Sequence, residues 1–190
     1  MVLEYVEGHS LFEVIRRRPQ LSKPKKIDFH NQILDGITHL HSYGFSHGDM
    51  SLLNIILSED DVLKIFDFGR SISVHDPQQP SDPSMSSTAR YGVPEVATVI
   101  HAGTRPFTAP EILRGECTDG RLADAYSFGM ILLCIDRGGL INIEVRNQKK
   151  DILPNLSGLE VFEEQILPYL LKFDQRRRLA KDQRMKVPNE

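Results

Sequence analysis

Hydrophobic residues recur at helical spacing in two stretches near the start of the chain. The first covers residues 11–18, where Ser10 can cap a helix and Pro19 ends it. The second begins at Pro24 and ends near Gly44, with apolar residues three and four positions apart along its length. Both patterns are typical of helices that bury one face, so we expect two helices here.

Short apolar runs that are separated by turn residues predict strands. Residues 54–57 and 62–66 flank the turn at 58–61, and this arrangement is typical of a β-hairpin. The opening run of the chain is also strand-like, and it ends at Gly8. We therefore expect one or two small β-hairpins beside the helices.

Two further helical patterns lie in the second half of the chain. Residues 122–135 are apolar on almost every side, which predicts a buried helix, and residues 159–171 repeat at helical spacing. Residues 71–101 are rich in Pro, Ser, Asp and Gln without an apolar period, which predicts a flexible insertion. The expected fold class is α+β and mainly helical, with one domain over residues 1–184 and a tail at 185–190.

Composition narrows the class of protein. The chain has 190 residues, of which 40% are hydrophobic, and this is enough for the core of one domain. Its 23 basic and 26 acidic residues are mixed along the sequence, so we expect no nucleic-acid partner. No apolar stretch is long enough to span a membrane. Cys117 and Cys134 lack metal-ligand spacing and indicate free thiols, which are typical of the cytoplasm or nucleus.

Polar motifs follow one another in a fixed order and carry the candidate chemistry. Asp49 lies on a tight loop, where a carboxylate can orient a hydroxyl group and accept its proton. Asn54 and Asp67 offer the hard oxygen atoms that suit Mg²⁺, and Gly69 lets the backbone turn sharply beside them. Such a metal ion bridges phosphates and offsets the charge that develops during their transfer. The motifs occupy residues 47–54, 67–69, 103–111, 124–129 and 174–178.

In this order the motifs resemble those of eukaryotic protein kinases, namely H-x-D-x-x-x-x-N, D-F-G, A-P-E and D-x-x-S-F-G. The resemblance covers nearly the whole chain and identifies it with the mainly helical C-terminal lobe of a kinase-like domain. It implies transfer of the γ-phosphate of ATP to a Ser or Thr hydroxyl of a protein. The implied cofactors are ATP and Mg²⁺, and the implied partner is a protein substrate or binding protein.

The resemblance also assigns roles at the nucleotide. Asp49 is similar to the catalytic base of the family, and Asn54 and Asp67 are similar to its Mg²⁺ ligands. Residues 3–8 resemble the hinge that holds adenine through its backbone. The positions that resemble nucleotide-binding residues are Glu4 and Val6 in the hinge, Ser10 near the ribose and Ile56 beneath adenine.

Other positions resemble residues that support the site. His47 and Phe68, which precedes Gly69, are similar to members of the regulatory spine of the family. Asp124 is similar to the buried carboxylate that ties down the backbone of the catalytic loop.

The later motifs resemble the substrate loop and an ion pair of the family. Glu111 and Arg178 are similar to a buried pair, whose disruption would cost about 3–5 kcal/mol. Gly103 and Thr104 resemble the loop that receives the substrate residue, and Thr104 favours Ser/Thr over Tyr specificity.

The sequence also departs from the kinase pattern. Gly48 stands where many kinases have Arg, and Ser51 replaces the usual Lys, so the loop lacks two positive charges. By this resemblance the chain would begin at the hinge, and we expect residues 1–190 to lack the Gly-rich loop and the phosphate-binding Lys of the N-terminal lobe. We therefore expect weak or no activity from residues 1–190 alone. The upper face, which includes Val2, would be exposed and would favour self-association.

Two other functions fit parts of the pattern. A pseudokinase-type module would keep the fold and bind proteins without catalysis, and capture of a partner without binding of Mg·ATP would favour it. A small-molecule kinase of the aminoglycoside or choline type also uses H-G-D-x-x-x-x-N, which suits Gly48. That family does not carry the later motifs, which are represented here by Glu111, Asp124 and Arg178.

Overall fold

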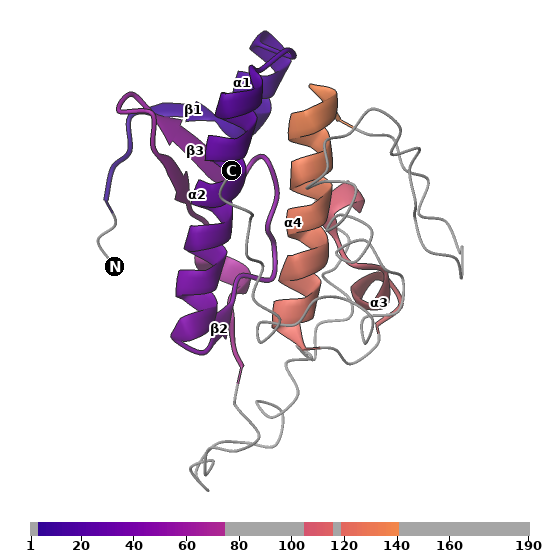
Figure 1. Ribbon diagram of the computed structural model, residues 1–190. Coiled ribbons are helices and arrows are strands. Elements are labelled where there is room, and N and C mark those ends of the chain that lie inside the picture. The colour runs from indigo at the N-terminus through magenta and orange to yellow at the C-terminus, as the bar shows by residue number, and fades with distance from the viewer. Residues whose placement is uncertain (1–3, 75–104, 116–118, 141–190) are drawn as a thin grey trace, which may run out of the picture.

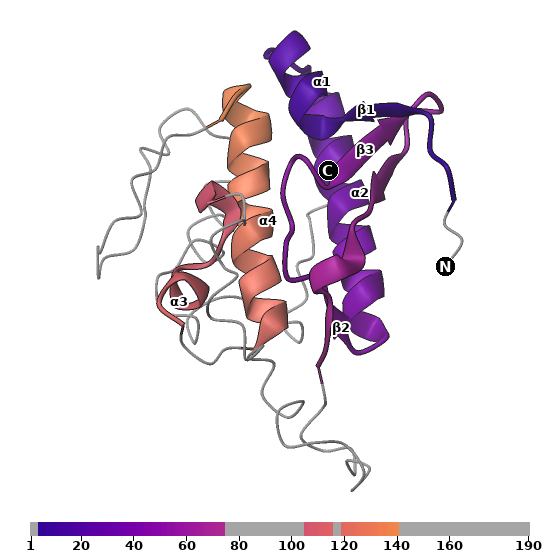
Figure 2. The same ribbon diagram turned by 180° about the vertical axis from the view of Figure 1, so that it is seen from behind.

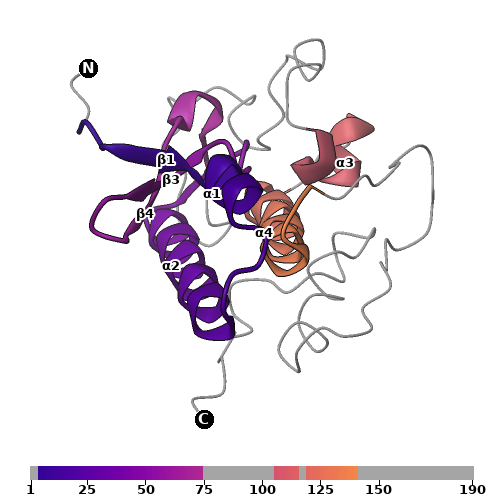
Figure 3. The ribbon, with the colours of Figure 1, turned by 90° about the horizontal axis from the view of Figure 1, so that it is seen from above.

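The computed structural model describes residues 4–74, 105–115 and 119–140 (Figure 1). The predicted helix at 159–171 and the predicted tail at 185–190 lie outside these residues. Within them, two long helices lie side by side and a small sheet packs beside one of them, as the view from above also shows (Figure 3).

The two long helices form an antiparallel pair. Helix α2 spans Lys23–Ser42, and helix α4 spans Gly120–Arg137. Near the start of α2, Lys26 donates to the backbone oxygen of Asp136 over 2.9 Å, near the end of α4. At the opposite ends, His41 contacts Asp124 over 2.8 Å. The predictions of both helices are confirmed, although α4 is longer than the range predicted for it.

Helix α2 packs against the protein through one face, whereas α4 is surrounded by protein on all sides. The buried apolar residues of α2 are Phe29, Ile33 and Ile37, which recur every four positions. All residues of α4 from Ala123 to Ile135 are buried, including the polar Asp124 and Ser127. Because α4 lies in the core, a polar group that it carries is shielded from water and has to find partners in the protein.

The first helix is short and begins at a side-chain cap. Helix α1 spans Leu11–Arg17, and the Ser10 hydroxyl accepts a hydrogen bond from the Glu13 N–H over 3.3 Å. Leu11 and Ile15, one turn apart, are both buried in the core. The prediction of a helix after Ser10 is therefore confirmed.

Three short strands form an antiparallel sheet in the order β1-β3-β4. They span Gly8–Ser10, Ile55–Ser58 and Leu63–Ile65. The hairpin of β3 and β4 confirms one prediction. The opening strand was predicted to end at Gly8, and this is wrong because β1 begins there. Gly8 lies opposite Ser58, the last residue of β3, so the residues before Gly8 have no strand to pair with.

A second pair of strands lies near the end of α2. Strand β2 spans Phe45–Ser46 and pairs with strand β5, Ile72–Ser73, in antiparallel fashion. The predicted flexible insertion included Ile72 and Ser73, so its beginning is wrong. Pairing with β2 supplies these two residues with backbone partners that local composition does not reveal. The remainder of that prediction, residues 75–101, lies outside the described residues.

The residues between β2 and β3 connect these parts. Figures 1 and 2 show residues 47–54, called here the 47–54 loop, running close to both long helices. Met50, Ser51 and Leu52 of this loop are almost completely buried. Helix α4 starts close to β2, since a Cβ atom on Gly120 would lie only 2.2 Å from the Ser46 hydroxyl oxygen. This close approach sets the first turn of α4 against the 47–54 loop.

Two short helical segments precede α4 in the chain. The 3-10 helix η4 spans Arg105–Phe107, and α3 spans Pro110–Leu113. The Ser127 hydroxyl donates to the Phe107 carbonyl oxygen over 2.7 Å and so ties η4 to α4. The described part of the chain therefore mixes helices with two small antiparallel sheets. It contains no helix with the length and apolar character that crossing a membrane requires.

Candidate active site

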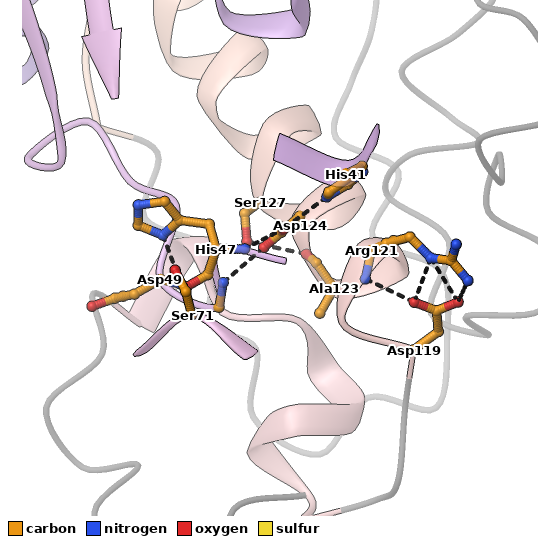
Figure 4. Close-up of polar contacts among 10 residues, drawn as sticks. His41, His47, Asp49, Ser71, Asp119, Arg121, Ala123, Asp124 and Ser127 are labelled. Atoms are coloured by element: carbon orange, nitrogen blue, oxygen red, sulfur yellow. Dashed lines mark hydrogen bonds and ion pairs between the residues drawn. The ribbon is translucent and has the colours of Figure 1, made fainter. Parts of the chain in front are cut away.

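The carboxylate of Asp124 anchors the start of the 47–54 loop (Figure 4). It lies on the second turn of α4 and is only 1% exposed. Its Oδ2 accepts from the His47 N–H over 2.8 Å, and its Oδ1 accepts from the Gly48 N–H over 3.0 Å. His41 donates from Nε2 to the same Oδ2 over 2.8 Å. Three donors thus surround one buried carboxylate, which holds the loop by its backbone.

His41 is a part of this anchor that the motifs do not reveal, since the sequence indicates only an ordinary histidine there, partly buried or at the surface. The residue lies on the last turn of α2 and is buried. Its position continues the four-residue repeat of Ile33 and Ile37, so the helical spacing could have revealed its burial. A buried imidazole needs a hydrogen-bond partner, and this need was the signal for a polar contact such as Asp124.

His47 connects the loop to the segment that follows β4. The Asp49 N–H donates to Nδ1 of His47 over 3.2 Å, while Nε2 of His47 lies 2.9 Å from the Phe66 carbonyl oxygen. These two contacts require the neutral tautomer that carries its proton on Nε2. The His47 and Phe68 rings are neighbours, with centroids 5.2 Å apart and planes tilted by 50°.

Asp49 is half-buried and its backbone is fixed from both sides. Besides the contact of its N–H with His47, its carbonyl oxygen accepts from the Asn54 side-chain nitrogen over 2.8 Å. Burial raises the pKa of the Asp49 carboxyl above its usual value, while the positive charge of Arg70 acts in the opposite direction. The neighbouring Asp67 also raises the pKa of this carboxyl. A carboxylate with a raised pKa is a stronger proton acceptor than an exposed one.

Asn54 and Asp67 place oxygen atoms beside Asp49. Because the Asn54 nitrogen donates to Asp49, its side-chain oxygen is the atom that can meet a cation. Asp67 has a left-handed backbone with φ of 61°, a conformation that Asp tolerates better than most residues. Among the described residues, its exposed carboxylate receives one long hydrogen bond of 3.4 Å, from the Gly69 N–H. This donor set fits Mg²⁺, which takes hard oxygen ligands.

Larger clusters of metal-ligating side chains are absent from the described ranges. No group of three or more His, Cys, Asp or Glu side chains there could hold a metal ion. This finding is compatible with Mg²⁺, because that ion binds through one or two protein ligands together with water and phosphate oxygens.

The predicted nucleotide-binding residues gather along the sheet. Ser10 lies opposite Ile56, and Ile56 lies opposite Lys64, so these three residues are neighbours across β1, β3 and β4. Lys64 forms an ion pair with Glu4, which brings Glu4 to the same part of the sheet. Val6 is partly buried. The structure thus gathers Glu4, Ser10 and Ile56, although the Ser10 hydroxyl also caps α1.

Large apolar side chains are exposed around this sheet and the segment that follows it. The exposed fraction is 86% for Tyr5 and 49% for Phe68, and Leu53 and Phe66 are also exposed. Val2, which was predicted to belong to the same face, lies outside the described residues.

The predicted substrate loop and ion pair are only partly described. Glu111 lies on α3 and is fully buried. Arg178, Gly103 and Thr104 lie outside the described residues, so their roles stay predictions. A buried carboxylate at position 111 is compatible with the expected ion pair.

Gly48 and Ser51, which depart from the kinase pattern, both lie where the protein leaves little space. Gly48 has a left-handed backbone with φ of +78°, and a Cβ atom there would lie 2.5 Å from the Arg70 carbonyl oxygen. The position therefore leaves no room for a side chain. Ser51 is fully buried, and its hydroxyl has no hydrogen-bond partner in the described part of the chain. Neither position can present a polar group to a substrate.

Comparison with known proteins relates the chain to a family. The family model described as Protein kinase domain matches residues 1–187. The CBL-interacting serine/threonine-protein kinase 8 of Arabidopsis thaliana is 32% identical over 140 residues, which are 74% of this chain and 28% of that protein.

Two further relatives match over a similar part of the chain. The CBL-interacting protein kinase 9 of Oryza sativa subsp. japonica is 31% identical over 74% of this chain and 27% of its own length. The maternal embryonic leucine zipper kinase of Xenopus laevis is 29% identical over 74% of this chain and 19% of its own length. The chain thus spans between 19% and 28% of the length of these curated relatives. Since the family model matches almost the whole sequence, the chain belongs to the protein kinase domain family.

Proposed function

We propose that this chain carries the catalytic loop of a kinase that transfers the γ-phosphate of ATP to a Ser or Thr hydroxyl of a protein. The observation that carries the proposal is the placement of Asp49. It lies on a loop whose backbone Asp124 holds, and the oxygen atoms of Asn54 and Asp67 are beside it.

The proposed chemistry assigns one task to each of these side chains. Asp49 accepts a hydrogen bond from the substrate hydroxyl and takes its proton as the oxygen forms its bond to phosphorus and ADP leaves. Asn54 and Asp67 would hold Mg²⁺, which, when bound, supplies positive charge to the phosphate oxygens. The hydrogen bonds that fix the backbone of Asp49 keep the carboxylate oriented toward the hydroxyl.

The class of substrate is supported by the relatives and by the sequence. The relative from Arabidopsis thaliana is named as a serine/threonine-protein kinase, and Thr104 lies where the resemblance favours Ser/Thr substrates. The names of two relatives refer to interaction with CBL. For this chain we propose only the broader class of partner, a protein substrate.

The proposal is tested by transfer of labelled γ-phosphate to a general Ser/Thr substrate protein, measured with the full-length protein. Asp49→Asn removes the proton acceptor and should lower the rate by about 100-fold or more. Asp35→Asn is the matched control, because Asp35 is an exposed residue of α2 away from the site. Wild-type rates in the Asp49 variant would refute the proposal.

A second candidate function, a pseudokinase-type binding module, is favoured by the missing positive charges. Neither Gly48 nor Ser51 can present a cation to a phosphate. Such a module would show neither transfer activity nor binding of Mg·ATP. A shift in thermal unfolding on addition of Mg·ATP therefore separates the two functions, because a ligand that binds the folded protein stabilises it.

A further inference from the structure

The 47–54 loop contains no Lys or Arg, yet phosphoryl transfer depends on positive charge around the transferred group. The resemblance expects a positively charged side chain at positions 48 and 51, and the structure has room for one at neither position. Gly48 has no space for a side chain, and Ser51 is buried with its hydroxyl inside the protein. If this site transfers phosphate, the charge has to come from another segment.

Arg70 is the residue that closes position 48. Its carbonyl oxygen would lie 2.5 Å from a Cβ atom on Gly48, and its own Cβ would lie 3.7 Å away. The backbone of Arg70 therefore packs directly against Gly48, the residue before Asp49. Arg70 can approach this closely because position 48 has no side chain.

The segment that carries Arg70 is tied to the 47–54 loop. The 3-10 helix η1 spans Phe68–Arg70 and follows Asp67 directly. The hydroxyl of the next residue, Ser71, donates to the His47 carbonyl oxygen over 3.4 Å, and Ile72 pairs with Ser46 in the strand before the loop. Arg70 is therefore held between Asp67 and a strand pair that flanks His47.

Arg70 lies close to Asp49, because its backbone packs against Gly48, the residue that precedes Asp49 in the loop. Arg70 as a whole residue is partly buried. A guanidinium binds phosphate oxygens through two parallel hydrogen bonds, which suits this position.

We propose that Arg70 supplies the positive charge that the 47–54 loop lacks, by contacting the phosphoryl group that is transferred next to Asp49. The inference rests on the proposed kinase function and adds a residue to its site. It makes Arg70, from the segment after Asp67, the substitute for a cation within the loop itself.

The test compares two nucleotides that differ at the transferred phosphate. Calorimetric titration of the full-length protein with Mg·ADP and with the non-hydrolysable Mg·adenylyl imidodiphosphate isolates the contribution of the γ-phosphate. Arg70→Ala should weaken binding of the triphosphate analogue about tenfold and leave Mg·ADP unchanged, since a hydrogen bond to a charged group is lost. Arg70→Lys, which keeps the charge, should restore most of the affinity.

Arg17→Ala is the control, because Arg17 is an exposed arginine of α1 that contacts His9 and Glu13. Unchanged Mg·ADP affinity in the Arg70 variant also shows that it remains folded. The inference is overturned if Arg70→Ala binds both nucleotides as the wild type does, or weakens both equally. Equal loss in Arg17→Ala would overturn it as well. If the wild type binds neither nucleotide, the proposed function itself fails.

Discussion

Replacing Asp124 by Asn would remove one acceptor and the negative charge from the anchor of the 47–54 loop, with almost no change of side-chain volume. In the wild type, Oδ2 accepts from His47 and His41, and Oδ1 accepts from Gly48. The Asn oxygen satisfies most donors when it takes the place of Oδ2. Its NH₂ group then faces the Gly48 N–H, so that two donors meet and one hydrogen bond is lost.

The magnitude follows from these three contacts. A hydrogen bond to a charged group contributes about 1.5–3 kcal/mol to stability, and one to a neutral group contributes about 1 kcal/mol. Losing one bond and weakening two should cost about 2–4 kcal/mol of unfolding free energy. A typical domain has about 5–15 kcal/mol, so the Asp124→Asn variant should remain folded.

Amide hydrogen exchange measured by NMR is the assay, supported by urea unfolding. The Gly48 amide should exchange about 10- to 100-fold faster in the variant, because its acceptor is replaced by a donor. The His47 amide should change less, because the Asn oxygen still accepts from it. Asp35→Asn, on the exposed side of α2, serves as the control.

Two results would refute this reasoning. Unchanged exchange at Gly48 would mean that Asp124 does not hold the loop. An equal acceleration at Gly48 and at the core amides of α4 would mean that the variant loses global stability without a local opening of the loop.

Three other changes have defined outcomes. Gly48→Ala should cost about 2–4 kcal/mol in urea unfolding, more than the roughly 1–2 kcal/mol expected at Gly115, which shares the left-handed backbone but has open space around it. Ser10→Ala should cost about 1 kcal/mol because the cap of α1 is lost, whereas Ser22→Ala should change little, since Ser22 caps α2 without a side-chain hydrogen bond. Asp49→Asn should raise the melting temperature at pH 7 in metal-free buffer, because the raised pKa means that ionised Asp49 destabilises the folded state. That gain should shrink as the pH falls through the raised pKa and vanish below the usual value of 3.8; a gain that persists there would contradict it.

The spacing of apolar residues was sufficient to predict α2 and α4, two regular helices that pack against each other. The four-residue repeat of α2 and the continuous apolar run of α4 both reflect burial, so their positions followed from the sequence. Strand β5 did not, because Ile72 and Ser73 belong to a polar stretch, and their partners Phe45 and Ser46 are distant in the chain. A two-residue strand contains no period from which it could be recognised.

The candidate site was also predictable only in part, because some of its contacts join segments that are distant in the chain. The motif order placed Asp49, Asn54 and Asp67 together, and the structure does bring them to one region. The contact of His41 with Asp124 joins residues 83 positions apart, so helical spacing indicates the burial of His41 but not its partner. The lack of space for a side chain at Gly48 likewise results from the approach of Arg70 from another segment.

The anchor at Asp124 has a consequence for how this loop can vary in evolution. It grips the N–H groups of residues 47 and 48, which every amino acid except proline possesses. Exchanges at these two positions therefore leave the contacts with Asp124 in place, provided that position 48 keeps a residue compatible with its backbone. The side chains of His47 and Asn54, in contrast, contact the Asp49 backbone directly and hold it. Selection for the position of Asp49 then acts on Asp124 and His41, in two helices, as well as on His47 and Asn54 in the loop itself.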